Sequence, residues 1–333
     1  MGKKITIAVD AMGGENSPKK VVDGINISLD TNTTNYFLLY GKKNILEKHI
    51  SKNSKIIKFC EIIHTDDTIK DTESPLTALK RGKNSSMWKS IESQNEKIAN
   101  ISLSAGNTGA LFVMAKMLLK TLDGIEKPAL AGLWPNNLGM NIVLDLGANI
   151  ECNEKNLVDF SKMGSALFKS LFGEKKPKVA LLNVGLEEIK GKEVLKKAFA
   201  LLKETDNSDF NFCGYIEGNR IMSGDSDVIV TDGFTGNIAL KTAEGTANFI
   251  TSKLKHSLSK ISVLLSYNKL RKFKDKLDPR KYNGAIFVGL QGPVVKSHGS
   301  TDALGFANAI DVCSKIINSD LINKIKSNLN SID

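Results

Sequence analysis

The chain has 333 residues, of which 41% are hydrophobic and 25% charged, and its formal net charge is +10 at pH 7. This composition supplies a large core and excludes a disordered or collagen-like chain. Cys60, Cys152, Cys213 and Cys313 are scattered without a C-x-x-C pair, so we expect reduced thiols and neither a disulfide framework nor a metal site. No apolar stretch reaches the length of a membrane span, which predicts a soluble, cytoplasmic protein.

Expected strands and helices alternate along most of the chain. The strands are short apolar runs at residues 5–9, 36–40, 56–63, 101–104, 129–133, 141–144, 178–184, 211–216, 227–231 and 285–290. The expected helices have apolar residues at helical spacing and cover residues 17–29, 45–50, 75–91, 108–122, 153–172, 187–204 and 301–328. The last of these is expected to break near Ser319, and a further helix is expected to begin at Thr235 or Asn237. This order predicts a three-layer α/β/α sandwich with a largely parallel sheet, in a single α/β catalytic domain over residues 1–333.

Four of the expected strands end in turns of one kind. Each turn has an Asp or Ser, then small residues, then a polar residue able to cap a helix. The candidate binding residues of the four turns are Asp10, Gly13 and Gly14, then Ser104, Gly106, Asn107, Thr108 and Gly109, then Asp145 and Asn149, and finally Asp232, Gly233, Thr235, Gly236 and Asn237. Glycine lets a ligand approach the backbone, and free N–H groups at a helix N-terminus favour an anion. Because ligands bind beyond the carboxyl ends of strands in open α/β sheets, the turns predict one shared cleft for a phosphate or an oxyanion. An ordinary capped turn is the alternative at each position.

A basic segment interrupts the alternation. Between Lys253 and Lys281 there are eight lysines and two arginines against Asp275 and Asp278. Two apolar stripes run through the segment, so residues 246–283 predict an amphipathic helical hairpin inserted in the domain. The stripes contain Leu254, Leu258, Ile261, Leu265 and Phe273. Such a surface suits a membrane, an acidic protein or a second subunit, and the sequence leaves these open.

Several sequence blocks follow one another in an order typical of one protein family. They are IAVDAMGG (7–14), KNSSM (83–87), SAGNTGA (104–110), LDLGAN (144–149), LLNVG (181–185) with Lys190 and Gly191, VTDGFTGN (230–237) and GPVVKSHGS (292–300). On these blocks, which span almost the whole chain, the sequence closely resembles the phosphate acyltransferases of bacterial phospholipid synthesis, the PlsX proteins.

The resemblance implies a fold like that of isocitrate and isopropylmalate dehydrogenases. It also implies transfer of a long-chain fatty acyl group from acyl carrier protein to inorganic phosphate, giving the acyl phosphate that a downstream acyltransferase uses to acylate glycerol 3-phosphate. A homodimer, peripheral contact with the membrane surface, and no cofactor are further implications.

Phosphate is itself a nucleophile, so the implied reaction needs no nucleophile from the protein. It needs a positioned phosphate, donors for a tetrahedral oxyanion and a proton for the leaving thiolate. Lys190 and His298 are the candidate catalytic residues with mobile charge, and Asn107 is the candidate side-chain donor. A surface role for Lys190 and a structural role for His298 are the alternatives.

Acyl carrier protein is acidic, which predicts that it contacts Lys80, Arg81 and Lys83 on the expected helix 75–91. The lysines of the chain lack interleaved aromatic residues, so we expect no nucleic acid. Three other functions stay open: a coenzyme A dependent phosphate acetyl- or butyryltransferase, a metal and nicotinamide dependent dehydrogenase, and a membrane-recruited scaffold without turnover. The dehydrogenase needs clustered carboxylates and a dinucleotide loop, and the sequence has no convincing example of either.

Overall fold

The computed structural model describes residues 4–50, 54–173, 175–204, 209–257 and 278–330. Its strands join in one 11-stranded sheet with the order β3-β2-β1-β4-β11-β10-β5-β6-β9-β7-β8. The strands are β1 (Ile5–Asp10), β2 (Asn35–Gly41), β3 (Cys60–His64), β4 (Ile101–Ser104), β5 (Ala129–Asn136), β6 (Gly139–Leu144), β7 (Lys178–Asn183), β8 (Asn211–Glu217), β9 (Val228–Val230), β10 (Ala285–Val288) and β11 (Val294–Lys296).

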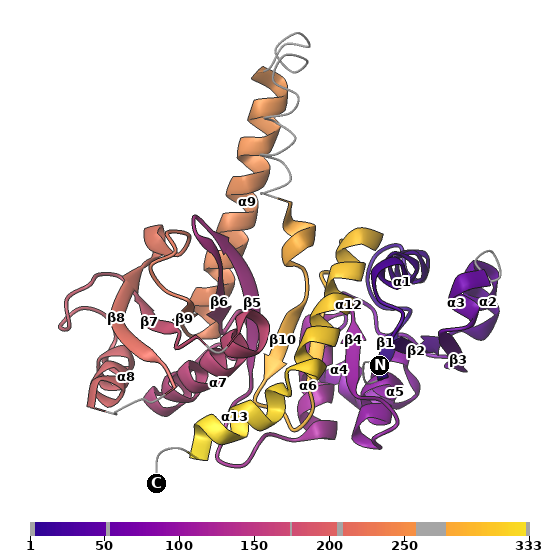
Figure 1. Cartoon of the computed structure of the whole chain (residues 1–333), viewed down its shortest axis with the longest axis horizontal. Helices are drawn as coiled ribbons and strands as arrows, with labels where there is room; N and C mark the ends of the chain where they lie inside the picture. The colour runs from indigo at the N-terminus through magenta and orange to yellow at the C-terminus, as the bar shows by residue number, and fades with distance from the viewer. Residues whose placement is uncertain (1–3, 51–53, 174, 205–208, 258–277, 331–333) are drawn as a thin grey trace.

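Helices cover both faces of this sheet (Figure 1). One face carries α1 (Lys19–Thr31), α2 (Lys43–Ile50), α3 (Ser54–Ile57), α7 (Glu154–Phe172), α8 (Glu193–Glu204), α12 (Ala303–Asn318) and α13 (Leu321–Asn330). The other carries α4 (Pro75–Arg81), α5 (Ser86–Asn95), α6 (Thr108–Leu119) and α9 (Gly233–Ser257). Along β9 the side chains alternate between the two cores, with Val228 and Val230 in one and Ile229 in the other. The predicted α/β/α arrangement is confirmed.

Most neighbouring strands are parallel, as predicted, but a short antiparallel section reverses the sheet. Strand β10 is antiparallel to both β11 and β5, and β5 is antiparallel to β6. As a result, β6 and β9 run opposite to β1 and β4. Their carboxyl ends therefore point in opposite directions, which differs from the expected common edge, and the shared cleft stays a prediction.

Several predicted elements differ from those observed. Residues 54–57 form the helix α3, and strand β3 begins only at Cys60. The expected helix 75–91 is interrupted by the 3-10 turn Gly82–Asn84, and Ser85 then caps α5 through a bond from the Trp88 N–H. The helix expected from residue 187 begins at Glu193.

Helix α9 extends away from the sheet, as Figure 1 shows in orange. It contains the first residues of the predicted hairpin, including the partly buried Leu254. Leu258, Ile261, Leu265 and Phe273 lie outside the described residues, so the hairpin stays a prediction. None of the described helices combines the length and apolar character that a membrane span requires.

Candidate active site

Three neighbouring strands bring polar residues together at one edge of the sheet. Strands β1, β4 and β11 run parallel, and their register aligns Asp10 with Ser104 and Ser104 with Lys296. These residues lie far apart in the sequence but end adjacent strands. The first two predicted turns therefore share one edge, together with the last part of the block 292–300.

Asp10 is buried at the base of this site, with 1% of its surface exposed. Its carboxylate accepts hydrogen bonds from the hydroxyl groups of Ser86 at 2.6 Å and Ser104 at 2.7 Å. Burial raises the pKa of Asp10, and the two hydroxyl donors oppose this rise. A Cβ atom on Gly13 would lie 2.5 Å from Asp10 Oδ2 and 2.7 Å from the backbone nitrogen of Gly106. Glycine at position 13 therefore allows the two turns to pack directly on each other.

Two buried lysines lie beside these turns. Lys20 is 4% exposed and donates to the carbonyl oxygen of Gly299. Lys296 is 8% exposed and donates to the carbonyl oxygens of Ala105, at 3.5 Å, and Ser297. Among the described residues, no carboxylate forms an ion pair with either ammonium group.

The pKa values of both lysines reflect this environment. Burial lowers the pKa of Lys20, and burial together with the charge of Lys20 lowers the pKa of Lys296 to about 8. The carboxylates of Glu15, Asp71 and Asp10 oppose the shift of Lys20, and those of Asp71 and Asp10 oppose the shift of Lys296. Buried cations that have only carbonyl partners are costly unless an anion compensates them, so this geometry favours binding of an anion.

His298 lies exposed at the rim of the same site. Its backbone N–H donates to Asn283 Oδ1 at 2.8 Å, and the backbone N–H of Ser300 donates to its Nδ1 at 3.3 Å. Because Nδ1 accepts this bond, the neutral ring carries its hydrogen on Nε2. Partial burial and the nearby lysines lower the pKa of His298, although Glu244 opposes them. At pH 7 the ring is therefore a neutral donor.

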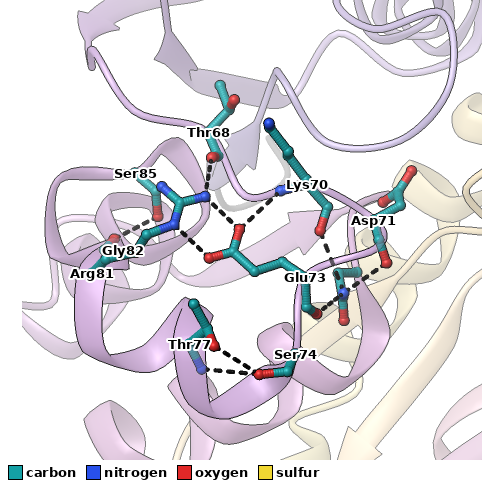
Figure 2. A network of polar contacts seen from close by, with 10 residues as sticks. Thr68, Lys70, Asp71, Glu73, Ser74, Thr77, Arg81, Gly82 and Ser85 are labelled. Carbon is teal, nitrogen blue, oxygen red and sulfur yellow. Dashed lines mark hydrogen bonds and ion pairs between the residues drawn. The ribbon is translucent and has the colours of Figure 1, made fainter.

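Asn107 holds a neighbouring loop in place. Its Oδ1 caps α6 by accepting from the Ala110 N–H at 3.0 Å. Its Nδ2 donates to the carbonyl oxygens of Lys70, Asp71 and Glu73 at 3.4, 2.9 and 2.8 Å. We call residues 67–73 the strap; Figure 2 shows its carbonyl groups and the bonds they make. The amide of Asn107 is thus bonded to the strap, and its N–H groups are directed to the strap carbonyl groups rather than to the predicted role of oxyanion donor.

The other predicted residues of the α6 turn have different surroundings. Thr108 is exposed in the first turn of the helix. A Cβ atom on Gly109 would lie 2.7 Å from Pro75 Cγ, so this glycine permits close packing of α6 on α4. Gly14 has φ +79°, and a Cβ atom there would lie 2.8 Å from Lys20 Nζ.

The turns after β6 and β9 form a separate cluster. Asp145 is fully buried, and its carboxylate accepts from the backbone N–H groups of Leu130 and Ala148, both at 3.0 Å, and from that of Asn149 at 2.7 Å. Asp232 accepts from the Thr235 N–H at 2.7 Å and so caps α9. Both aspartates therefore have structural partners.

Close packing explains the glycines of this second cluster. A Cβ atom on Gly236 would lie 2.0 Å from the Asp145 carbonyl oxygen, and one on Gly233 would lie 2.5 Å from the Asn149 carbonyl oxygen. Asn237 is exposed and donates to the Leu146 carbonyl oxygen at 3.2 Å. The start of α9 thus packs directly against the turn 145–149.

Lys190 lies in the exposed loop between β7 and α8. Its ammonium group pairs with Glu187 at 2.8 Å, and this partner raises the pKa of Lys190. No contact among the described residues joins Lys190 to His298. The structure therefore does not bring the two predicted mobile charges together.

The three cations predicted to contact a carrier protein lie on α4 and the turn that follows it. Lys80 and Lys83 are exposed. Arg81 instead forms a two-bond ion pair with Glu73, as Figure 2 shows, and also donates to the Thr68 carbonyl oxygen at 3.4 Å. Arg81 therefore binds the strap and is not free to pair with a carrier protein.

The sequence analysis did not single out Lys20, Lys296, Ser86 or Asp71. The sequence could have pointed to Ser86 and Lys296, because they lie inside the family blocks 83–87 and 292–300. Lys20 follows Gly14 by six residues in the first turn of the expected helix 17–29, which is also a usable signal. Asp71 had none, because it lies in an irregular loop.

No group of three or more His, Cys, Asp or Glu side chains gathers in a way that could hold a metal within the part of the chain that the structure describes. The carboxylate cluster that a metal dependent dehydrogenase requires is therefore not found among those residues.

Solved structures of phosphotransacylases have a similar fold. A phosphotransacetylase from Streptococcus pyogenes aligns with a TM-score of 0.63 at 14% identity, covering 96% of this chain and 95% of that one. EutD phosphotransacetylase from Staphylococcus aureus aligns with a TM-score of 0.61 at 16% identity, covering 96% of this chain and 94% of that one. The fold thus defines an α/β protein of the class to which these phosphotransacylases belong, with two buried lysines at the carboxyl ends of its parallel strands.

Sequence similarity identifies the family. A family model described as a fatty acid synthesis protein matches residues 5–324. The phosphate acyltransferase of Pelagibacter ubique is 57% identical over 334 residues, which is 99% of this chain and 100% of that protein. That of Rhodopseudomonas palustris (strain BisB18) is 45% identical over 336 residues, 99% of this chain and 95% of the relative. The chain belongs to the PlsX family of phosphate acyltransferases, enzymes of fatty acid and phospholipid synthesis.

Proposed function

We propose that this enzyme transfers a long-chain acyl group from acyl carrier protein to inorganic phosphate at the site formed by Lys20, Lys296 and the turns at Gly13 and Gly106. The observation that carries the proposal is the pair of buried ammonium groups, which among the described residues have carbonyl partners and no carboxylate ion pair. A phosphate dianion would supply the missing charge.

Phosphate would bind through the ammonium groups of Lys20 and Lys296. Charge-assisted bonds of this kind are stronger than neutral ones. The N-terminus of α6 begins at Thr108, three residues beyond the carbonyl group that accepts from Lys296, and adds a favourable dipole. Asp10 stays out of contact with phosphate because Ser86 and Ser104 occupy its oxygens.

In the reaction, a phosphate oxygen attacks the carbonyl carbon of the thioester, and the carbonyl π electrons move onto its oxygen. The oxyanion then collapses, the C–S bond breaks, and the thiolate leaves and takes up a proton. We assign the oxyanion to His298 Nε2–H, the donor at the rim of the site. Lys296 is the proton donor for the thiolate, because its pKa of about 8 is close to that of a thiol.

The carrier protein would approach over α4. Lys80 at the end of α4 and Lys83 in the following turn are exposed and offer positive charge to an acidic partner. We further propose that the enzyme is a homodimer, that the segment 246–283 contacts its partner subunit or the membrane surface, and that the acyl phosphate is passed to an acyltransferase acting on glycerol 3-phosphate. The excess of positive charge in that segment supports the membrane contact.

Acyl phosphate formation from labelled phosphate tests the proposal, with a long-chain acyl carrier protein and acetyl coenzyme A as alternative donors. We expect product from the carrier protein alone, and loss of product in a folded Lys296→Met variant. Product only from acetyl coenzyme A would identify a short-chain transferase. Absence of product from both donors would favour the scaffold.

A further inference from the structure

The strap passes beside the proposed phosphate site and is fastened at two points. Asn107 Nδ2 donates to three strap carbonyl groups, with distances of 2.9 Å to that of Asp71 and 2.8 Å to that of Glu73. On the other side, Arg81 binds the Glu73 carboxylate and the Thr68 carbonyl group. In Figure 2 the bonds to the strap converge from both sides, while the Lys70 and Asp71 side chains point away from Arg81.

One fastening point adjoins the lysine site directly. Asn107 follows Ala105 by two residues, and the carbonyl oxygen of Ala105 accepts from Lys296 Nζ. The backbone of Asp71 is therefore held next to the turn that carries the anion site. The Asp71 carboxylate acts on both lysines, since it raises the pKa of Lys20 and of Lys296.

We propose that Asn107 is a positioning residue that fastens the strap at the start of α6 and thereby holds the carboxylate of Asp71 beside Lys20 and Lys296. The held carboxylate opposes the positive charge of the site. It weakens the binding of phosphate and of acyl phosphate, so that both anions exchange rapidly with solvent. The inference rests on the proposed phosphate site, and it assigns to Asn107 the role of setting the affinity of that site for phosphate.

The test is a double-mutant cycle in the full-length enzyme at pH 6.5, below the pKa of about 8 of Lys296. Asp71→Asn removes the negative charge. Asn107→Ser keeps an oxygen that can cap α6 but is too short to reach the three carbonyl groups of the strap. We expect each single variant to lower the KM for phosphate on the order of fivefold, the size of one charge interaction in a partly hydrated site, with the KM for the acyl donor unchanged.

The double variant separates the proposed coupling from two independent effects. If Asn107 acts through Asp71, then Asn107→Ser changes the phosphate KM little in the Asp71→Asn background, so that the two effects are not additive. Additive effects, or a phosphate KM that rises in either single variant, would overturn the proposal. Thr77→Val is the matched control on α4, because Thr77 bonds Ser74 and none of the strap carbonyl groups.

A second readout does not depend on turnover. Hydrogen exchange of the backbone amides of residues 67–73 should accelerate at least tenfold in Asn107→Ser and stay unchanged in Thr77→Val. Unchanged exchange in Asn107→Ser contradicts the fastening role even if the enzyme makes no acyl phosphate. Accelerated exchange in an enzyme inactive toward phosphate would support the fastening while refuting the proposed function.

Discussion

Replacing Lys296 by Met gives the most informative perturbation of the site. Methionine has a similar length and can occupy the same buried space without a charge. The substitution removes the ammonium group that donates to the Ala105 and Ser297 carbonyl oxygens. We expect it to abolish phosphate-dependent activity and to change the pH dependence of stability.

The magnitude follows from the pKa of Lys296, which burial lowers from 10.5 to about 8. Each unit corresponds to 1.36 kcal/mol, so the charged side chain destabilises the folded state by about 3 kcal/mol. Below pH 8 the lysine is protonated in both folded and unfolded states, and this cost is present in full. Between pH 8 and 10.5 the unfolded state binds more protons, so the stability of the wild type rises with pH; above 10.5 the cost is absent.

Urea unfolding of the wild type and of Lys296→Met at pH 7, 9 and 10.5 measures this difference directly. We expect the free energy of unfolding of the variant, relative to the wild type, to fall by about 3 kcal/mol from pH 7 to 10.5. Lys19→Met is the matched control, because the Lys19 side chain is 70% exposed and pairs with Asp23 on the surface. A relative stability of Lys296→Met that does not change with pH would refute the assignment of a buried, charged lysine.

The remaining predictions concern packing in the second cluster, the rim of the site and the loop of Lys190. Gly236→Ala should destabilise the protein by on the order of 3 kcal/mol in thermal unfolding, because its Cβ atom would lie 2.0 Å from a backbone oxygen. Gly245→Ala is the control on the same helix; its Cβ atom would have nothing within 4 Å, so this variant should be neutral or stabilising. Equal effects of the two substitutions on stability would contradict the close packing at Gly236. The wild-type rate should not fall as pH decreases through the pKa of His298, which is lowered from 6.5, because protonation at Nδ1 leaves the Nε2–H donor in place and adds positive charge. His298→Ala, which has no donor, should be slower over the same pH range, and an unchanged rate in the variant argues against the role at the rim. Lys190→Met should keep the rise in melting temperature that phosphate causes, since Lys190 pairs with Glu187 in the exposed loop between β7 and α8, and loss of that rise would place the anion at this loop.

The sequence predicted the layers of the fold well because local patterns determine them. Buried strands and amphipathic helices each have their own periodicity, and the break near Ser319 is confirmed between α12 and α13. The direction of each strand is not local. It depends on which strands pair, and the pairing of β5 with both β10 and β6 has no signal in the spacing of residues. This is why four similar turns were expected at one edge.

The candidate site was predicted in part for a related reason. Small residues after a strand mark positions of close approach, but the sequence does not show whether a ligand or another backbone approaches. At Gly13 the neighbours are Asp10 and Gly106, within the proposed anion site, whereas at Gly236 the neighbour is the Asp145 backbone. The buried lysines were missed because a lysine looks the same in sequence whether it is exposed or buried, and only tertiary packing separates Lys20 from Lys19.

The position of a bound anion decides whether Lys20 and Lys296 form the phosphate site. Crystals of the enzyme soaked with arsenate, a phosphate analogue, would reveal the arsenic atom by its anomalous scattering. We expect an arsenate oxygen within hydrogen-bond distance of the Nζ atoms of both Lys20 and Lys296. Arsenate bound instead at the start of α9, near the ion pair of Asp232 and Lys192, would contradict the proposed phosphate site.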